Sequence, residues 1–429
     1  MSSTARSGRT RALAASFALA LVAIAVSGCA TAARFREADI QPVVLQDYLK
    51  DKPEPVQAHY ATLLRQGQRN AVLNHARAGL GALELGAYDV AKTSFDQALL
   101  GIEAVYAQSD TAAQARKLWT AEAYKDFKGE PYERAMTYYY RGLLYLRDGD
   151  YENARASFKG GLLQDAFAED EQNRSDFALL AFLEGWASRC AGNSDLAAQS
   201  FAEVTSVKSE FQVPKDGENV LLIAETGTAP IKFGDGPKRS LLKFRRGDGF
   251  DERKVKFELG GDKPVDAFAL EDIYWQASTR GGRPIDHILA GKVEFQETGK
   301  VAGQVATAIG AATLAVAMRQ RSNAGMIAGG AILLLGIAAQ AAADAARPEA
   351  DARYWDNLPD GIHVATVSLT DETPTVDVKF FDSSDALLEP LSKTVDIARA
   401  GTCALAWSRA RSAIPSDPRA PGTITQTGQ

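Results

Sequence analysis

The sequence predicts an α+β protein in which N-terminal helices precede a smaller β-rich domain. Residues 57–212 carry apolar side chains at three- and four-residue spacing with almost no proline, which is the period of amphipathic helices. From residue 213, Gly, Pro and Asp punctuate short runs of alternating polarity, which is typical of strands and turns. With 429 residues, 46% of them hydrophobic, the chain is long enough for two domains.

Residues 1–28 have the layout of a secretory signal. A positive segment contains Arg6, Arg9 and Arg11, and an apolar stretch follows over residues 12–26. The stretch is too short and too rich in alanine to be read first as a membrane span. We therefore expect an exported protein.

Cys29 directly follows Ser27 and Gly28, and this ending resembles the lipobox of bacterial lipoproteins. The resemblance implies cleavage before Cys29 and a lipid attached to its thiol. The resemblance also implies that Ala30, directly after the cysteine, favours placement of the lipoprotein in the outer membrane over the inner membrane. An ordinary secretory signal is the alternative. Residues 29–56 are then expected to form a tether.

Three units with one spacing recur in the helical block 57–212. Each has a Gly, a second Gly seven residues later, then Ala and Phe at 12 and 16 residues. The first glycines are Gly79, Gly142 and Gly185. In a helix–turn–helix, the first Gly permits close approach, the second ends the first helix in a left-handed cap, and Ala and Phe face the partner helix. The units resemble tetratricopeptide repeats, although their spacing departs from the usual period of about 34 residues. Generic helical hairpins are the alternative.

The resemblance to that family predicts a partner-binding groove, because the first helix of each repeat lines the concave surface. The residues placed there are Leu73, Leu80, Leu83, Tyr139, Leu143, Leu146, Leu179, Phe182 and Trp186. So apolar a groove is not expected to face water. We expect an apolar helix to cover it, from this chain or from a partner protein.

The second half, residues 213–410, contains four runs that read as strands: 219–225, 254–259, 362–369 and 375–381. The last two are expected to form a hairpin through residues 370–374. The tail, residues 411–429, is rich in Pro, Ser, Thr and Gly and is expected to be disordered.

A helical stretch over residues 284–346 interrupts these strands. It contains two apolar arms, 301–318 and 324–343, each just long enough to span a bilayer. Three interpretations stay open: a buried hairpin, insertion into a membrane, or self-association through small residues. Gln304 and Gln340 favour burial in protein.

Cys190 and Cys403 are the cysteines that remain beside Cys29. They are 213 residues apart, in segments assigned to different domains. We expect two buried thiols, with a disulfide as the alternative in an oxidising compartment.

The sequence offers little support for catalysis. The four histidines are scattered, and neither Gly234–Ser240 nor Thr298–Lys300 has the spacing of a phosphate-binding loop. We therefore expect no metal, no cofactor and no enzymatic activity. The formal charge of −6 and the lack of a basic patch argue against nucleic acid as a partner.

Two further motifs stand out. In residues 129–140, Glu133 and Arg134 begin a helix that continues with three tyrosines. A charge pair with aromatic core packing is the favoured interpretation, and a partner-binding rim is the alternative. In residues 351–359, Asp351 is expected to pair with Arg353 or cap a turn, and Trp355 to pack in the core.

The lipobox, the helical repeats, the strand region, the apolar hairpin and the 351–359 run together resemble a family of proteobacterial lipoproteins with tetratricopeptide-like repeats. The resemblance implies a place in the cell envelope and no known enzymatic activity. We expect an outer-membrane lipoprotein on the periplasmic face, held by Cys29, that acts as a protein-binding scaffold in envelope assembly or maintenance. Its protein partner is not identified by the sequence. The alternative is a membrane-active component whose residues 301–343 insert into the bilayer or oligomerise.

Overall fold

The computed structural model describes residues 37–103, 126–166, 176–236, 239–260, 264–279, 350–369 and 373–414, together with Gln304. The signal with Cys29, the apolar arms apart from Gln304, and the tail beyond residue 414 lie outside the described residues. The predictions made for them stay predictions.

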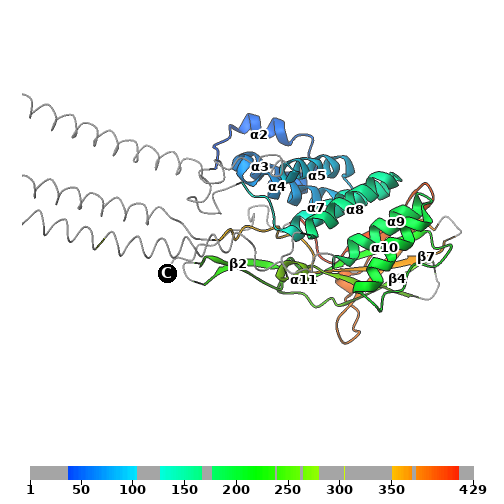
Figure 1. Ribbon diagram of the computed structural model, residues 1–429. Coiled ribbons are helices and arrows are strands. Elements are labelled where there is room, and N and C mark those ends of the chain that lie inside the picture. Colours follow the sequence, from blue (N-terminus) through cyan, green and yellow to red (C-terminus); the bar gives the residue numbers. More distant parts are fainter. Residues whose placement is uncertain are drawn as a thin grey trace, which may run out of the picture.

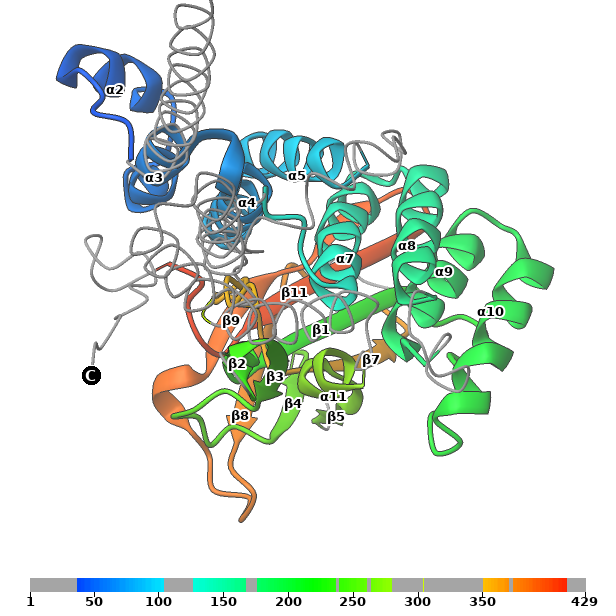
Figure 2. The same ribbon diagram turned by 60° about the vertical axis from the view of Figure 1, so that its left-hand side comes forward.

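The chain is α+β, as the sequence predicts. Helices from the N-terminal half form a layer above strands from the C-terminal half (Figure 1). Figure 2 shows these helices following one another across the strands. One hydrophobic core cluster contains side chains from both parts, for example Leu143 and Leu180 of the helices with Leu221 and Ile223 of the strands.

Three helical pairs carry the repeated spacing of the sequence. The pairs are α4 (Ala71–Glu84) with α5 (Tyr88–Glu103), α7 (Pro131–Asp148) with α8 (Tyr151–Asp165), and α9 (Ala178–Cys190) with α10 (Ser194–Val207). Before them lie α2 (Pro42–Leu49) and α3 (Gln57–Gln66). Helix α2 falls within the stretch expected to be a tether, and Pro42 in its first turn supplies a backbone angle suited to a helix start.

The glycines act as the spacing predicts. The second glycine of each unit has a positive φ: 72° at Gly86, 76° at Gly149 and 84° at Gly192. The first glycine lies directly against the phenylalanine of the partner helix. A Cβ atom on Gly142 would lie 2.3 Å from Cε1 of Phe158, so only glycine permits this close approach.

A five-stranded sheet lies beneath the helices, in the order β10-β11-β1-β7-β6. Its strands are β10 (Ala398–Ala400), β11 (Cys403–Arg409), β1 (Val220–Thr226), β7 (Gly361–Val367) and β6 (Phe268–Asp272). Strand β11 runs parallel to β1, whereas β7 runs antiparallel to it. Every residue of β1 is buried, so this strand is the centre of the molecule.

A four-stranded sheet covers the other face of β1, in the order β5-β4-β8-β9. Its strands are β5 (Val265–Asp266), β4 (Lys254–Glu258), β8 (Thr375–Phe381) and β9 (Lys393–Asp396). A separate pair consists of β2 (Ile231–Asp235) and β3 (Leu241–Arg245), and helix α11 (Ile273–Ser278) follows β6.

The prediction of a hairpin between residues 362–369 and 375–381 is wrong. Both segments are strands, but β7 pairs with β1 and β6, whereas β8 pairs with β4 and β9 in the other sheet. The chain crosses between the sheets instead of turning back. The reason is burial: the apolar faces of β7 and β8 contribute to packing between the two sheets, which a two-stranded hairpin alone does not provide.

The expectation of two free thiols is also wrong. Cys190 at the end of α9 and Cys403 at the start of β11 form a disulfide, with their Cα atoms 5.8 Å apart. Thr402 donates a hydrogen bond from Oγ1 to the main-chain oxygen of Cys190, 2.6 Å away. Strand β11 packs beneath the helices, so residues distant in sequence become neighbours.

The close approach of the helices predicts a graded response to Gly→Ala substitution. The added Cβ would lie 3.1 Å from Phe95 at Gly79, 2.7 Å from Phe201 at Gly185, and 2.3 Å from Phe158 at Gly142. Alanine favours a helix by about 1 kcal/mol over glycine, whereas overpacking costs about 1–3 kcal/mol. We expect Gly79→Ala to be nearly neutral and Gly142→Ala to be the most destabilising.

Urea denaturation of the three variants measures this series. Equal effects at all three positions would contradict the contact-based explanation.

Candidate functional site

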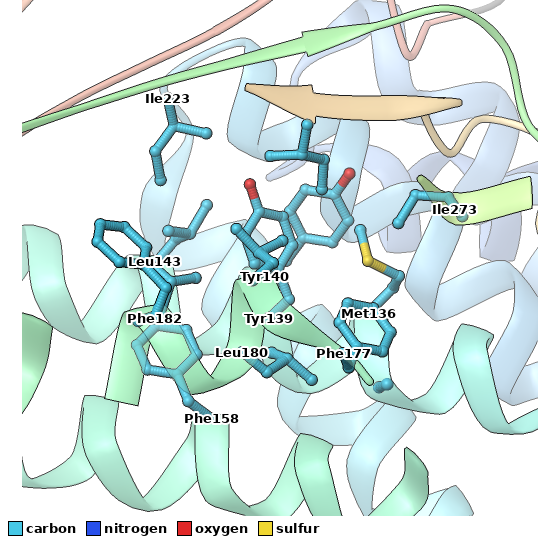
Figure 3. Packing of buried hydrophobic residues seen from close by; sticks show 14 of the residues in the cluster. Met136, Tyr139, Tyr140, Leu143, Phe158, Phe177, Leu180, Phe182, Ile223 and Ile273 are labelled. Atoms are coloured by element: carbon cyan, nitrogen blue, oxygen red, sulfur yellow. The ribbon is translucent and has the colours of Figure 1, made fainter. Parts of the chain in front are cut away.

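The predicted partner groove is filled by the chain's own sheet. The nine residues assigned to it are only 0–6% exposed. Figure 3 shows Ile223 of β1 and Ile273 of α11 in one cluster with Leu143 and Phe182. The groove is covered, as expected, but mainly by strand residues such as Leu221 and Ile223 and in part by Ile273 of the short helix α11. This concave surface is a core and is not open to a partner.

Glu225 of β1 lies at the centre of this helix–sheet boundary and is bound by both sides. Its Oε1 accepts from Tyr139 Oη at 3.1 Å and Trp407 Nε1 at 2.9 Å, and its Oε2 accepts from Tyr140 Oη at 3.0 Å. Arg409 Nη1 lies 3.2 Å from Oε2. Burial raises the pKa of Glu225, while Arg409 and the three donors oppose that rise. An ionised carboxylate, which only accepts, fits these donors.

A second buried carboxylate, Glu271 of β6, has a different environment. It accepts from the main-chain nitrogen of Leu179 at 3.1 Å, from Gln276 Nε2 at 3.0 Å and from the main-chain nitrogen of Asp272 at 3.3 Å. Burial raises the pKa of Glu271 to about 7. Its bond to Leu179 ties the start of α9 to the edge of the sheet.

The residues in the first turn of α7 have a structural role. Glu133 is buried and accepts from the main-chain nitrogen of Glu130 at 2.7 Å and of Trp355 at 2.6 Å. Arg134 turns away to Gln164 Oε1, 2.7 Å from its Nε. The favoured interpretation is confirmed in its aromatic packing, because Tyr139 and Tyr140 are in the core. The expected charge pair is replaced by a capping box with Glu130.

The run 351–359 is structural, as predicted. Arg353 Nη2 lies 2.7 Å from Asp351 Oδ2, and Arg353 Nη1 donates to Asn70 Oδ1 at 2.6 Å. Trp355 is 1% exposed and belongs to the core shared by helices and sheet. This run therefore fastens the strand half of the chain to the segment before α4.

Two cavities lie at opposite edges of the five-stranded sheet. One of about 430 Å³ adjoins β11 and β9, and its lining includes Glu84, Arg147 and Lys393. The other, of about 610 Å³, lies beside β7; we call it the β7 cleft. Its lining comprises Phe182, Glu210–Val213, Lys215, Glu218, Val265–Phe268 and Val364–Ser368. Sequence reasoning missed both cavities, since they depend on where strands leave the sheet.

Two other kinds of site are not found in the described part of the chain. Within those ranges, no group of three or more His, Cys, Asp and Glu side chains is placed to hold a metal ion. The same ranges contain no helix of the length and apolarity needed to cross a bilayer. The apolar arms, apart from Gln304, lie outside these ranges.

Comparison with protein-family models, with curated proteins and with solved structures finds no match to this chain.

The Glu225 network predicts a large effect of removing its cation. Arg409→Met leaves a buried carboxylate without its opposite charge, and such losses cost about 3–5 kcal/mol. We expect Glu225→Gln combined with Arg409→Met to recover part of that loss, because the neutral amide keeps one oxygen as the acceptor for Tyr139 and Trp407 and its NH2 group can donate to the Tyr140 hydroxyl. The free energy of unfolding in urea measures both variants.

Arg155→Met is the matched control, because Arg155 pairs with Glu152 at the surface. An exposed pair of this kind contributes at most about 1 kcal/mol. If Arg409→Met were as mild as this control, the network would not carry the charge assigned to it.

Glu271 predicts a pH dependence of stability. Burial raises its pKa from 4.5 to about 7, so the folded chain holds this proton more tightly than the unfolded chain. Its contribution to the free energy of unfolding is then greatest below about pH 4.5 and falls as pH rises to about 7. Glu271→Gln does not ionise, and its stability relative to the original chain should rise by on the order of 3 kcal/mol across this window.

Urea titrations at several pH values between 4.5 and 8 test the dependence, with Glu152→Gln as an exposed control. A stability difference for Glu271→Gln that does not change with pH would refute it.

Proposed function

We propose that this chain is a lipid-anchored protein of the bacterial outer membrane, facing the periplasm, which binds another envelope protein as a scaffold and has no enzymatic activity. The observation that carries the proposal is the Cys190–Cys403 disulfide. Disulfides persist in oxidising compartments such as the periplasm and are rare in the cytosol. The bond agrees with export by the N-terminal signal.

The lipobox supplies the anchor in this proposal. After cleavage, residues 30–41 separate Cys29 from α2. Twelve residues span at most about 40 Å when extended. A lipid on Cys29 would therefore hold the folded body close to the membrane surface without a membrane-spanning segment.

Binding is favoured over catalysis because the buried acids hold the fold together. Glu225 bonds to residues of α7 and β11, Glu133 to the run before β7, and Glu271 to α9. The bonds to α7, to Trp355 and to α9 join the helical half of the chain to the strand half. A body fastened in this way is rigid, as a platform for a partner should be.

The helical pairs fit a tetratricopeptide-like origin in this proposal. Their glycine and phenylalanine contacts have the geometry that such repeats need. Their concave face is filled by β1 and its neighbours. A partner must therefore bind at a different surface from the one that open repeats use.

Replacement of Cys29 by Ser tests the anchor. We expect the original chain to stay with the outer membrane and Cys29→Ser to appear in the periplasmic fraction, because the lipid is the only attachment in this proposal. Fractionation without detergent measures this. Membrane retention of the Cys29→Ser chain would instead favour insertion of residues 301–343.

The mass shift of the original chain after thiol alkylation tests whether the protein lies in an oxidising compartment. In the denatured, unreduced chain we expect no reactive thiol, because Cys29 is lipidated and the other two cysteines are bonded. Reduction should expose two. Free thiols at Cys190 and Cys403 before reduction would contradict an oxidising location.

A further inference from the structure

The five-stranded sheet has an incomplete edge at β7. Strand β6 pairs with β7 from Gly361 to Val364 and no further. The cause lies in the segment before β6: Ala267 donates from its main-chain nitrogen to Val255 in the other sheet, 3.0 Å away. Among the described residues, no strand pairs with β7 beyond Val364 on this side.

The uncovered part of β7 presents main-chain groups to the β7 cleft. The carbonyl oxygen of Val367 accepts from Asn219 on the β1 side, at 3.0 Å. Successive residues of an antiparallel strand direct their main-chain groups to opposite edges. The N–H and C=O of Thr366 therefore face away from β1 and into the cleft, where a further strand would pair.

The walls of the β7 cleft are apolar. Phe268 and Phe211 pack edge to face at 5.4 Å between ring centroids, and Phe211 packs in turn on Phe182. Val213 is 42% exposed and adds an apolar side chain to this lining. A peptide side chain that points toward this wall must be apolar to replace the water there.

The rim of the β7 cleft is acidic. Glu210, Glu218 and Asp266 line it, and Lys215 is the one cation among its described lining residues. A complementary peptide carries basic side chains at the positions that face the rim. Because side chains alternate along a strand, one extended segment can direct apolar residues inward and basic residues outward.

We propose that the β7 cleft binds an extended segment of a partner protein, in which apolar and basic residues alternate, as an added strand beside Thr366. This inference rests on the proposed scaffold function and names its binding surface. Main-chain hydrogen bonds to β7 provide affinity, while the apolar wall and acidic rim select the side chains. The cleft volume of about 610 Å³ is in the range of ligand-binding sites.

The test uses the exported full chain, purified with its disulfide formed, and a fluorescent hexapeptide in which valine and lysine alternate. Fluorescence anisotropy should show saturable binding. A second hexapeptide with N-methyl groups on the alternate residues whose N–H groups face β7 cannot donate main-chain hydrogen bonds to that strand. It should bind about thirtyfold more weakly, because two net hydrogen bonds are lost. A valine–glutamate hexapeptide should also bind much more weakly.

Variants of the chain test the same surface. Thr366→Pro removes the N–H that faces the cleft, whereas Thr366→Val removes only the hydroxyl that donates to Glu218. We expect the first to weaken binding about fivefold, because one net hydrogen bond is lost, and the second, which keeps the N–H, to weaken it less. Val213→Lys should repel the basic peptide, with Leu163→Lys as the control on an exposed apolar residue of α8.

Equal binding of the N-methylated and unmodified peptides to the original chain would overturn the proposal, even if a variant fails to fold. So would a dimer that Thr366→Pro dissolves, since a second copy would then occupy the edge. If the anchor and the disulfide are intact but no peptide binds, the proposal for the β7 cleft is refuted and the proposed function is not. Loss of the anchor or the disulfide would refute the proposed function instead.

Discussion

Burial of β1 on both faces is the constraint on which the rest of the structure depends. Leu221 and Ile223 face the helices, whereas Leu222 and Ala224 face the second sheet. A strand enclosed in this way removes apolar surface from water on two sides. The helical pairs cannot leave β1 without exposing their own apolar faces, so helices and sheets form one core.

This burial creates an electrostatic requirement, because the helices bring tyrosine hydroxyls into the same interior. Tyr139 and Tyr140 need acceptors once water is excluded. Glu225 provides them, and Arg409 balances its charge. Cys403, which is disulfide-bonded to Cys190, is the first residue of β11, and Arg409 is the last residue of the same strand. Covalent and polar links therefore reinforce the same boundary.

Because the concave face is filled, a partner protein must bind elsewhere, and the edges of the sheet are the surfaces that remain. Helical repeats that stand alone keep an open groove. In this chain, the strands fill the concave face of the helical pairs. The segment before β6 leaves one sheet for the other at Ala267, and the edge of β7 opens as a result. An open edge beside an apolar cleft accommodates an extended peptide better than a helix.

The amino-acid sequence is sufficient to predict the local structure: the helical pairs, their glycine turns, four of the strands and the packing of Trp355. These follow from backbone angles, periodicity and side-chain size, which act over a few residues. Three features depend on long-range packing: Cys190 meets Cys403, β7 and β8 lie in different sheets, and a sheet fills the groove. These outcomes depend on which apolar faces bury one another, and no short-range pattern specifies that choice.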